Sequence, residues 1–424
     1  MGKFRVLRNA GRLRLGVVVG AMVFVGCNES LDAGAACPVL CPAQNVIVRD
    51  TVLDAVSLDT TVSGFPLTGT ELTLFLAARG DTVDVRGVVR FDSLTATFTH
   101  NGLDSAIATI DSAGLVLLFD RANSTYSAPV RFDLYDVDTT AADTSLAAIR
   151  VLFRGDRLIG GVTLDTNQIK DTTIVPLDNA LILEKILNKK RLRVGIQVSS
   201  SKPVVLLTGT LNASRGANVQ YDPSADTLVK SVVVGALSKA PADNAELQGD
   251  LTDYQVVIKS PQAPATTDAL SIGGLEGRRA FLRFNVPAFI IDSATVLRAT
   301  LLAVQRPVRG FDQDKPFTMQ PQFVTAGREV TDISRSAVLI ALLNGLDSLR
   351  VTPADSGLRQ LEMVTVLRAW ASSGNSATQR ALVLRSAAEG TSPLEMQFYS
   401  TRAAPALRPR LRVSYATRTN FGIP

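Results

Sequence analysis

Short runs of β-forming residues follow one another along most of this chain, and their spacing limits the folds that it can adopt. The runs are rich in β-branched and aromatic residues, are separated by Gly, Asp and Thr, and recur at intervals of about 8 to 15 residues. Such spacing is typical of an all-β sandwich or barrel. In the first half we expect strands over Val46–Val48, Leu72–Ala77, Val83–Phe91, Leu115–Phe119, Val130–Val137 and Ile149–Phe153.

Two segments have helical periodicity instead. Asp178–Lys190 has an acidic residue at its start and lysines at its end, which is the charge order that the helix dipole favours. Leu361–Ser372 follows Gly357 and precedes Gly374, and glycines of this kind commonly mark the ends of a helix. We therefore predict one short helix in each half of the chain.

Six sequence elements occur in the same order in both halves. Each half has an Arg-Phe strand, an Ile-Asp-Ser-Ala stretch, further strands, the helix, a strand led by arginine and a closing strand that contains tyrosine. The two Arg-Phe pairs are Arg90-Phe91 and Arg283-Phe284. We interpret the order as a tandem duplication, which predicts two jelly-roll-like β-sandwich domains over residues 46–222 and 230–416.

The length of 424 residues fits two or three domains of about 150 residues each. The net charge of +5 arises entirely from the first 14 residues, which contain Lys3, Arg5, Arg8, Arg12 and Arg14 and no acid. The rest of the chain balances its basic residues against 39 acidic ones. Because no basic surface is implied, the composition argues against nucleic acid as a partner.

The N-terminus has the three parts of an export signal. Basic residues 1–14 are followed by the apolar run 15–25 and then by Gly26-Cys27. This arrangement resembles a bacterial lipoprotein signal peptide, in which residues 1–26 are removed and the cysteine, here Cys27, carries the lipid. An uncleaved N-terminal anchor is the alternative, although the apolar run is short for a membrane span. Either arrangement places the bulk of the chain outside the cytoplasm, in the cell envelope.

The residue after the cysteine is Asn28. In lipoproteins of bacteria with two membranes, Asp at this position retains the protein in the inner membrane, so the resemblance favours the outer membrane. Residues 27–45 are small, polar and contain proline, which is typical of a tether. No other run approaches 18 apolar residues, so we predict no transmembrane helix and a membrane contact through the lipid alone.

Two further cysteines, Cys37 and Cys41, lie in the tether. An exported compartment permits a disulfide between them, and free thiols are the alternative. A zinc site would need four ligands, and the only histidine is His100, far along the chain. The sequence therefore predicts no metal site.

Motifs of known catalytic sites are missing from the chain. Any triad would have to use His100, which we place at a strand end that leads into a turn. There is no Gly-x-Ser-x-Gly elbow, no His-Glu-x-x-His and no phosphate-binding Gly-rich loop. A pair of acids could still form a hydrolase site, but the sequence singles out no pair. We predict no catalytic residues and no cofactor.

Three local features have two interpretations each. The acidic segment Asp133–Asp143 could bind calcium, or it could be a strand with a polar outer face, because it lacks the residue order of a helix–loop–helix calcium site. Trp370 could stack on a sugar or pack its helix against a sheet, and we expect packing. In the Arg-Phe pairs we expect Phe in the core, with Arg either exposed to solvent or paired with an Asp.

Residues 254–415 resemble a DNRLRE-type domain. The resemblance rests on Arg279–Pro287, Ala294–Leu301, Val364–Trp370 and Arg408–Val413. Such domains are β-sandwich modules of exported bacterial proteins, and some are classed with carbohydrate-binding modules that accompany polysaccharide lyases. The resemblance implies a lipid-anchored, non-enzymatic module that binds polysaccharide or another surface component. The alternative is a structural spacer that contacts envelope proteins, and exposed aromatics clustered on one face would favour binding. The sequence names no ligand-binding residue.

Overall fold

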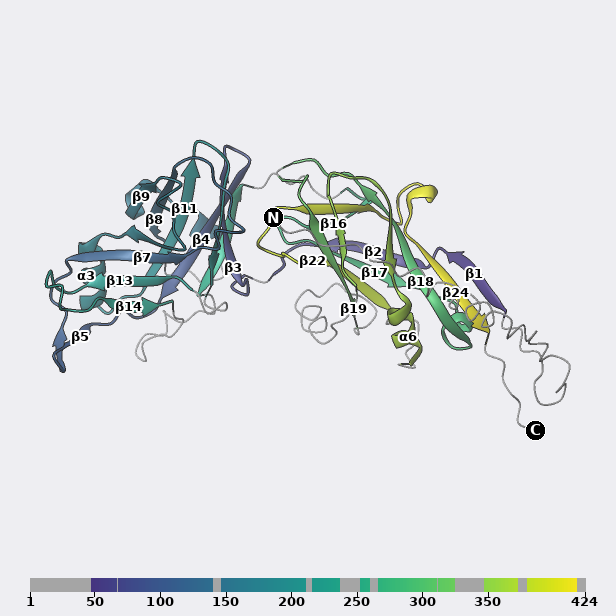
Figure 1. The fold of residues 1–424 in the computed structure, drawn as a ribbon, viewed down its shortest axis with the longest axis horizontal. Helices are drawn as coiled ribbons and strands as arrows, with labels where there is room; N and C mark the ends of the chain where they lie inside the picture. The colour runs from purple at the N-terminus through teal and green to yellow at the C-terminus, as the bar shows by residue number, and fades with distance from the viewer. Residues whose placement is uncertain are drawn as a thin grey trace, which may run out of the picture. The chain divides into compact units, whose positions relative to one another are not determined.

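The fold is built almost entirely from antiparallel strands (Figure 1). The computed structural model describes residues 47–66, 68–139, 146–210, 216–236, 252–259, 266–310, 312–324, 347–372 and 380–417. Within these ranges the strands form two sandwiches, each closed over its own apolar core. The predicted all-β sandwich class is confirmed.

The first sandwich packs a seven-stranded sheet against a four-stranded sheet. The larger sheet contains, in spatial order, β12 (Val204–Gly209), β3 (Thr73–Arg79), β4 (Val83–Phe91), β11 (Leu192–Ser200), β8 (Val130–Asp136) and β9 (Leu158–Leu164), and β15 (Asp253–Lys259) also pairs with β4. The smaller sheet contains β10 (Thr172–Pro176), β7 (Ser112–Leu118), β13 (Asn218–Asp222) and β14 (Val232–Gly235). A separate hairpin joins β5 (Thr97–His100) and β6 (Leu103–Ala106).

The second sandwich packs a six-stranded sheet against a five-stranded sheet. The six-stranded sheet contains β1 (Val48–Leu53), β24 (Arg410–Thr417), β18 (Ala294–Arg306), β23 (Glu395–Tyr399) and β16 (Ala269–Gly273), with β21 (Gly357–Glu362) also pairing with β18. The five-stranded sheet contains β2 (Val56–Val62), β17 (Arg279–Phe284), β22 (Ala381–Ser386), β19 (Phe317–Val324) and β20 (Leu349–Val351).

Strand pairing differs from the boundaries expected at 46–222 and 230–416. Strand β2 pairs with β17 and β1 with β24, so the first strands of the chain complete the second sandwich. Conversely, β14 pairs with β13 and β15 with β4, in the first sandwich. The first sandwich is thus inserted between β2 and β16. Sequence order could not reveal this, because a strand bonds equally well to a partner that is distant in the chain.

The two sandwiches share a pattern of pairing. In the first, β4 pairs with β11 and β7 with β13. In the second, the corresponding strands behave alike, because β17 pairs with β22 and β18 with β24. Phe91 and Phe284 are fully buried in the two cores, as the alternation of the Arg-Phe strands predicts. These matches agree with the order of elements in the two halves of the sequence.

Both predicted helices form. In α3 (Asn179–Leu187), the Asp178 side chain caps the N-terminus by accepting from Ala180 N at 2.9 Å. Helix α6 (Val364–Ser372) begins after the expected Leu361, because the preceding residues form β21, and Glu362 Oε1 accepts from Val364 N at 3.0 Å. The described residues also contain two short helices, α2 (Leu146–Arg150) and α4 (Ala288–Ile291), and the 3-10 turns η1 (Gly155–Arg157) and η5 (Pro405–Leu407).

The strand expected over Ile149–Phe153 is wrong. Residues 146–150 form α2, and its fully buried Ile149 packs on an apolar cluster together with Leu146, Leu152 and Phe153. The spacing of Leu146, Ile149 and Leu152 is three residues, which suits one face of a helical turn. The segment covers the outer face of the seven-stranded sheet.

Glu71 lies in the connection between β2 and β3 and is 6% exposed. Its Oε2 accepts a hydrogen bond from Gly69 N at 2.7 Å. Burial raises the pKa of its carboxyl to about 7, and the charge of Asp253 adds to the rise. The folded chain therefore favours the protonated form of Glu71 more strongly than the unfolded chain does.

We expect Glu71→Gln to stabilise the chain above pH 7 and to have no such benefit below pH 4.5. In the wild type, stability should be lost as pH rises from about 4.5, the ordinary pKa, to about 7, by up to ~3 kcal/mol. The neutral amide removes this loss. Urea denaturation from pH 4 to pH 8 measures the effect.

Glu184→Gln is the matched control. A hydrogen bond from Lys190 lowers the pKa of Glu184. The contribution of Glu184 to the free energy of unfolding therefore changes with pH only below the ordinary pKa of a carboxyl group. Parallel stability curves for wild type and Glu71→Gln across this pH range would contradict the prediction.

Candidate ligand-binding face

An aromatic pair lies on the outer face of the seven-stranded sheet. Along β8, Phe132 and Leu134 are buried in the core, whereas Tyr135 points to the opposite face and is half-buried. The Tyr135 ring meets the Phe153 ring edge to face, with centroids 5.5 Å apart. Both rings pack at the rim of the apolar cluster that includes Ile149. Of the acidic segment, Asp133–Asp136 lies in β8, and there the strand has the expected polar outer face, which also carries an aromatic ring.

A glycine makes room for the Phe153 ring. Gly195 on β11 lies opposite Tyr135. A Cβ atom on Gly195 would approach Phe153 Cε1 and Val137 Cγ1 to 2.6 Å, which is closer than packed carbon atoms allow. With no side chain at this position, the ring lies directly on the sheet, and this part of the face stays flat.

Polar side chains surround the aromatic pair. The Tyr135 hydroxyl donates to Gln197 Oε1 at 3.1 Å, and Gln197 lies opposite Asp133. Arg131 donates from Nε to Asp133 Oδ1 at 2.8 Å. We name this surface the Tyr135 face and define it by Asp84, Arg86, Arg131, Asp133, Tyr135, Phe153 and Gln197.

Arg86 connects the polar and aromatic parts of the Tyr135 face. It donates to Asp84 from Nε at 3.0 Å and from Nη2 at 2.8 Å, a bidentate geometry that fixes the guanidinium plane. The same guanidinium lies 4.8 Å from the centroid of the Phe153 ring. The arrangement therefore holds the arginine against the ring before any ligand arrives.

The Tyr135 hydroxyl is protonated at neutral pH. Burial raises the pKa of Tyr135 above its ordinary value, and the negative charge of Asp133 adds to the rise. The group is a hydrogen-bond donor and acceptor, and its ring remains half-buried. Such an amphipathic ring suits a ligand that has both apolar and hydroxyl surfaces.

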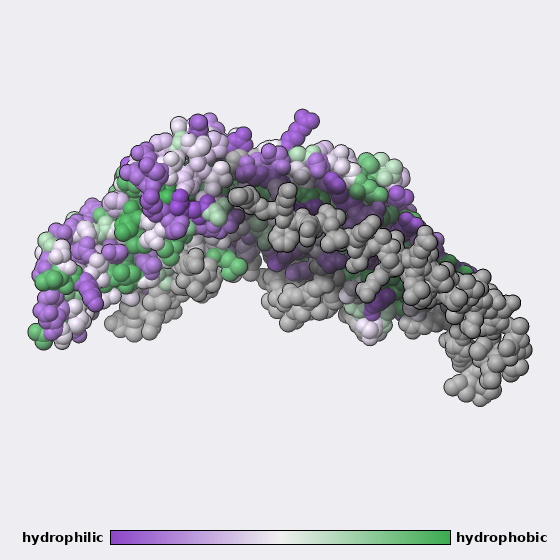
Figure 2. All heavy atoms as spheres, viewed as in Figure 1, coloured by the Kyte–Doolittle hydropathy of each residue, from purple (hydrophilic) through white to green (hydrophobic). Residues whose placement is uncertain are grey.

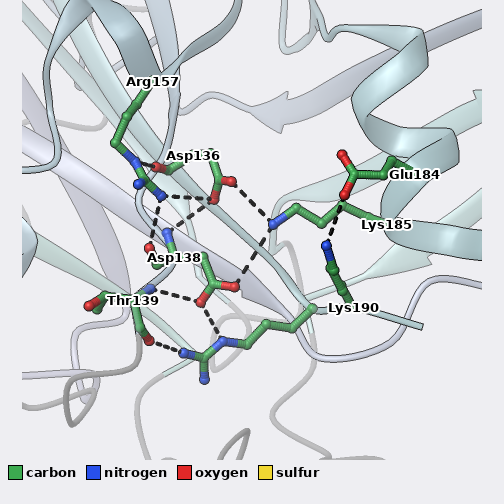
Figure 3. Close-up of polar contacts among 8 residues, drawn as sticks. Asp136, Asp138, Thr139, Arg157, Glu184, Lys185 and Lys190 are labelled. Carbon is green, nitrogen blue, oxygen red and sulfur yellow. Dashed lines mark hydrogen bonds and ion pairs between the residues drawn. The ribbon is translucent and has the colours of Figure 1, made fainter. Parts of the chain in front are cut away.

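Asp136 and Asp138, in the acidic segment, form an ion-pair network next to the Tyr135 face (Figure 3). Lys185 Nζ from α3 lies 3.1 Å from Asp136 Oδ2 and 3.9 Å from Asp138 Oδ2. Arg191 Nε lies 2.5 Å from Asp138 Oδ1, and Arg157 Nε donates to the carbonyl oxygen of Asp136 at 2.5 Å. The network ties the end of β8 to α3 and to the start of β11.

The carboxylates that would bind calcium are therefore already paired with the cationic side chains of lysine and arginine. Two carboxylates face the side chains of Lys185, Arg191 and Arg157, so a calcium ion would have to displace positive charge. Residues 140–143 of the acidic segment lie outside the described residues. Among the described residues, no group of three His, Cys, Asp or Glu side chains could hold a metal.

Trp370 packs in the core of the second sandwich and is not exposed to solvent. Its side chain is 4% exposed, and its ring centroid lies 5.5 Å from that of Phe284 in the core. The expectation of packing is confirmed. Of the two arginines in the Arg-Phe pairs, Arg90 forms a fully buried ion pair with Asp92 at 2.9 Å, while Arg283 is half-buried, with its Nε and Nη2 atoms unpaired.

The N-terminal predictions fall outside the described residues. This applies to the signal peptide, the tether, the lipid attachment at Cys27 and the pair Cys37 and Cys41. His100 is half-buried at the end of β5, and a turn through Asn101 and Gly102 follows, as expected. None of the described helices is long and apolar enough to cross a membrane.

Two open hollows exist elsewhere on the described surface. One of about 760 Å³ in the first sandwich is lined by Phe119, Asp120, Arg121 and Asp171 among others, but Phe119 is 6% exposed and its ring packs on Phe132. The other, of about 550 Å³, lies beside Arg368 in the second sandwich, and no ring lines it. Neither hollow displays an exposed aromatic side chain.

Exposed apolar side chains are otherwise scattered. Figure 2 shows hydrophilic and hydrophobic residues interspersed over the visible face. Phe289, 54% exposed, is the most exposed aromatic among the side chains that the structure describes, and its ring centroid lies 5.9 Å from that of Tyr415. The pair Tyr135 and Phe153, in contrast, is half-buried at the surface and has Gln197 and Arg86 as polar neighbours held by hydrogen bonds.

Comparisons with known proteins identify no family for this chain. The chain matches no family model, and a search of curated proteins finds no match. Among solved structures it is similar to the N-terminal CBM22-1-CBM22-2 tandem domain of Paenibacillus barcinonensis Xyn10C, with 9% identity, a TM-score of 0.13, and coverage of 87% of this chain and 100% of that chain. A likeness this weak supports no argument about fold or function, and the resemblance to DNRLRE-type domains stays a prediction.

Asp136→Asn should destabilise the first sandwich. Lys185 is 8% exposed and would lose its nearest carboxylate, and leaving one partner of a buried pair uncompensated costs roughly 3 kcal/mol. Asp156→Asn, which breaks the exposed pair with Arg154, should cost about 0.5 kcal/mol. Urea denaturation compares the two.

The double variant Asp136→Asn/Lys185→Met separates charge from packing. Removing the buried ammonium should restore part of the lost stability, because methionine at position 185 leaves no buried charge without a partner. Equal losses for Asp136→Asn and Asp156→Asn would contradict a structural role for the network.

Proposed function

We propose that this chain is a non-enzymatic polysaccharide-binding protein of the bacterial cell envelope, anchored to the membrane by a lipid on Cys27. The observation that carries the binding part is the Tyr135 face. It combines two aromatic rings, a flat sheet surface and hydrogen-bonding groups that other side chains already hold in place. Binding sites of this kind pair apolar contact with a few positioned polar groups.

The chemistry of the face suits a sugar chain. A pyranose ring has an apolar surface of C–H groups and a rim of hydroxyl groups. The rings of Tyr135 and Phe153 offer apolar contact, and the nearby amide, carboxylates and guanidinium groups offer partners for hydroxyls. Because the polar partners are fixed before binding, the ligand loses less free energy to ordering the site.

The same contacts argue for binding without cleavage. A glycoside hydrolase needs two carboxyl groups across the scissile bond, one of them able to donate a proton. On the Tyr135 face, Asp84 and Asp133 are each engaged by an arginine on their own strand. Neither carboxylate is left for acid–base chemistry.

Lipid anchoring rests on the sequence. The basic residues 1–14, the apolar run 15–25 and Gly26-Cys27 support it, and Asn28 supports the outer membrane as the destination. Two or more acyl chains on Cys27 would give stable attachment, because a single chain binds membranes only reversibly.

Tyr135→Ala should weaken retention of the full chain by an immobilised polysaccharide. Loss of one stacking ring costs on the order of 1.4 kcal/mol, or about tenfold in affinity. Tyr135→Phe keeps the ring and loses only the hydrogen bond to Gln197, so its effect should be smaller. Affinity electrophoresis against a panel of neutral and acidic polysaccharides measures retention, with substrate breakdown followed in parallel.

Phe289→Ala is the matched control, because Phe289 is an exposed ring in the second sandwich. It should leave retention unchanged. Equal losses for Phe289→Ala and Tyr135→Ala would contradict the assignment of the site. If the wild type retains no polysaccharide, the proposal fails and a spacer that contacts envelope proteins becomes the better account.

Cys27→Ala tests the anchor. We expect the variant to move from the membrane fraction to the soluble fraction, because the acyl chains need the cysteine sulfur and amine. Fractionation followed by immunoblotting, with Cys37→Ala as control, makes the measurement. A variant that stays with the membrane would contradict lipid attachment.

A further inference from the structure

Four charged side chains on the Tyr135 face form two ion pairs of opposite order. On β8, Arg131 is followed by Asp133, and on β4, Asp84 is followed by Arg86. Residues two apart in a strand point to the same face. In each pair, an arginine nitrogen lies 2.8 Å from an aspartate oxygen. The face therefore carries two positive and two negative charges and no net charge.

The four charges lie close to the aromatic pair. After burial, the charges that shift the pKa of the Tyr135 hydroxyl are Asp133 and Asp84, which raise it, and Arg86 and Arg131, which lower it. Strand β11 lies between β8 and β4, and Gln197 on β11 faces Asp133. The side chains of Arg131 and Asp133 are 42% and 22% exposed, whereas those of Arg86 and Asp84 are 11% and 12% exposed. A ligand on Tyr135 would therefore meet Arg131 and Asp133 directly, with the second pair just beneath the surface.

The pair on β8 is held flat against the sheet. Gly161 on β9 lies opposite Asp133. A Cβ atom on Gly161 would come within 3.0 Å of Arg131 Nη2, within 3.1 Å of Asp133 Oδ1 and within 2.5 Å of the backbone oxygen of Phe132. Glycine at this position therefore leaves space for the ion pair, as Gly195 leaves space for Phe153.

Alternating charges disfavour an ionic ligand. A ligand carboxylate that approached Arg131 or Arg86 would also meet the aspartate already bound to that arginine, and the attraction and repulsion would largely cancel. A hydroxyl group both donates and accepts, so it can bind a carboxylate oxygen and a guanidinium N–H without disturbing either pair. The face is thus suited to hydroxyl groups and not to acidic groups.

The outer face of the five-stranded sheet differs, because its charges are not balanced. On the outer face of the five-stranded sheet, Arg279 and Arg385 share Glu389, at 2.5 Å and 3.7 Å, and Arg283 lies on the same face. That face has an excess of positive charge, whereas every charge on the Tyr135 face has an opposite partner.

We infer that the ligand of the Tyr135 face is a neutral polysaccharide, an inference that rests on the proposed function. Binding should then depend little on ionic strength, because no net charge on the protein attracts the ligand. An acidic polysaccharide should bind weakly, and its binding should not strengthen at low salt.

The test compares a soluble neutral β-glucan with polygalacturonate, using the full chain in detergent at about 20 mM and about 300 mM NaCl. Titration calorimetry should give a dissociation constant for the glucan that changes less than about twofold between these salts, and at least about tenfold weaker binding of polygalacturonate. Tyr135→Ala should bind the glucan about tenfold more weakly.

Asp133→Asn converts the face to a positive one, because Arg131 loses its partner. We expect this variant to gain polygalacturonate binding by about fivefold at low salt and to lose the gain at high salt. Asp268→Asn is the matched control, since Asp268 pairs with Arg306 at 3.1 Å at a comparably exposed site in the second sandwich. It should bind polygalacturonate as the wild type does.

The outcomes separate the inference from the function beneath it. Salt-sensitive preference of the wild type for polygalacturonate would overturn the inference and leave polysaccharide binding standing. An equal gain for Asp133→Asn and Asp268→Asn would overturn it too, because the gain would then not belong to the Tyr135 face. If no polysaccharide in the wider panel is retained, the proposed function itself fails.

Discussion

Strand β11 pairs with β4 on one side and with β8 on the other, and both the core and the Tyr135 face depend on these pairings. Its inward residues, among them Val194 and Ile196, are fully buried in the core of the first sandwich. Its outward residues are Gly195, which leaves space for the Phe153 ring, and Gln197, which accepts from Tyr135. A shift of one residue in this register would exchange the two sets and destroy both.

Pairing of charges within single strands is a second feature of this fold. Arg86 with Asp84 and Arg131 with Asp133 are each two residues apart on one strand, the first pair at most 12% exposed and the second 42% and 22% exposed. Ion pairs between neighbours on one strand need no long-range contact, so they neutralise a sheet face as soon as the strand forms. On the Tyr135 face these pairs leave no net charge.

The alternation of apolar residues and the helix-end signals predict individual strands and helices well. They do not predict which strands pair or where the Tyr135 face lies. The run 83–91 matches β4, and Asp178 caps the helix that its position predicts. The pairing of β2 with β17 joins segments more than 200 residues apart, and no local pattern encodes it. Tyr135 lies in the acidic segment, where the carboxylates suggest calcium binding and not an aromatic site. Phe153 lies in the run that the sequence predicts as a strand. The aromatic pair exists because α2 and its turn fold back over β11.

The inserted arrangement separates the two tasks of the proposed function. The tether leads into β1 and β2, which belong to the second sandwich, where Asp50 binds Arg412 from the last strand. The second sandwich therefore combines strands that precede the first sandwich in the chain with strands that follow it. The strands of the first sandwich lie between Thr73 and Lys259, so it can fold from a continuous segment. A lipid on Cys27 would then hold the second sandwich, and the Tyr135 face would belong to a unit whose pairing does not involve the anchored strands.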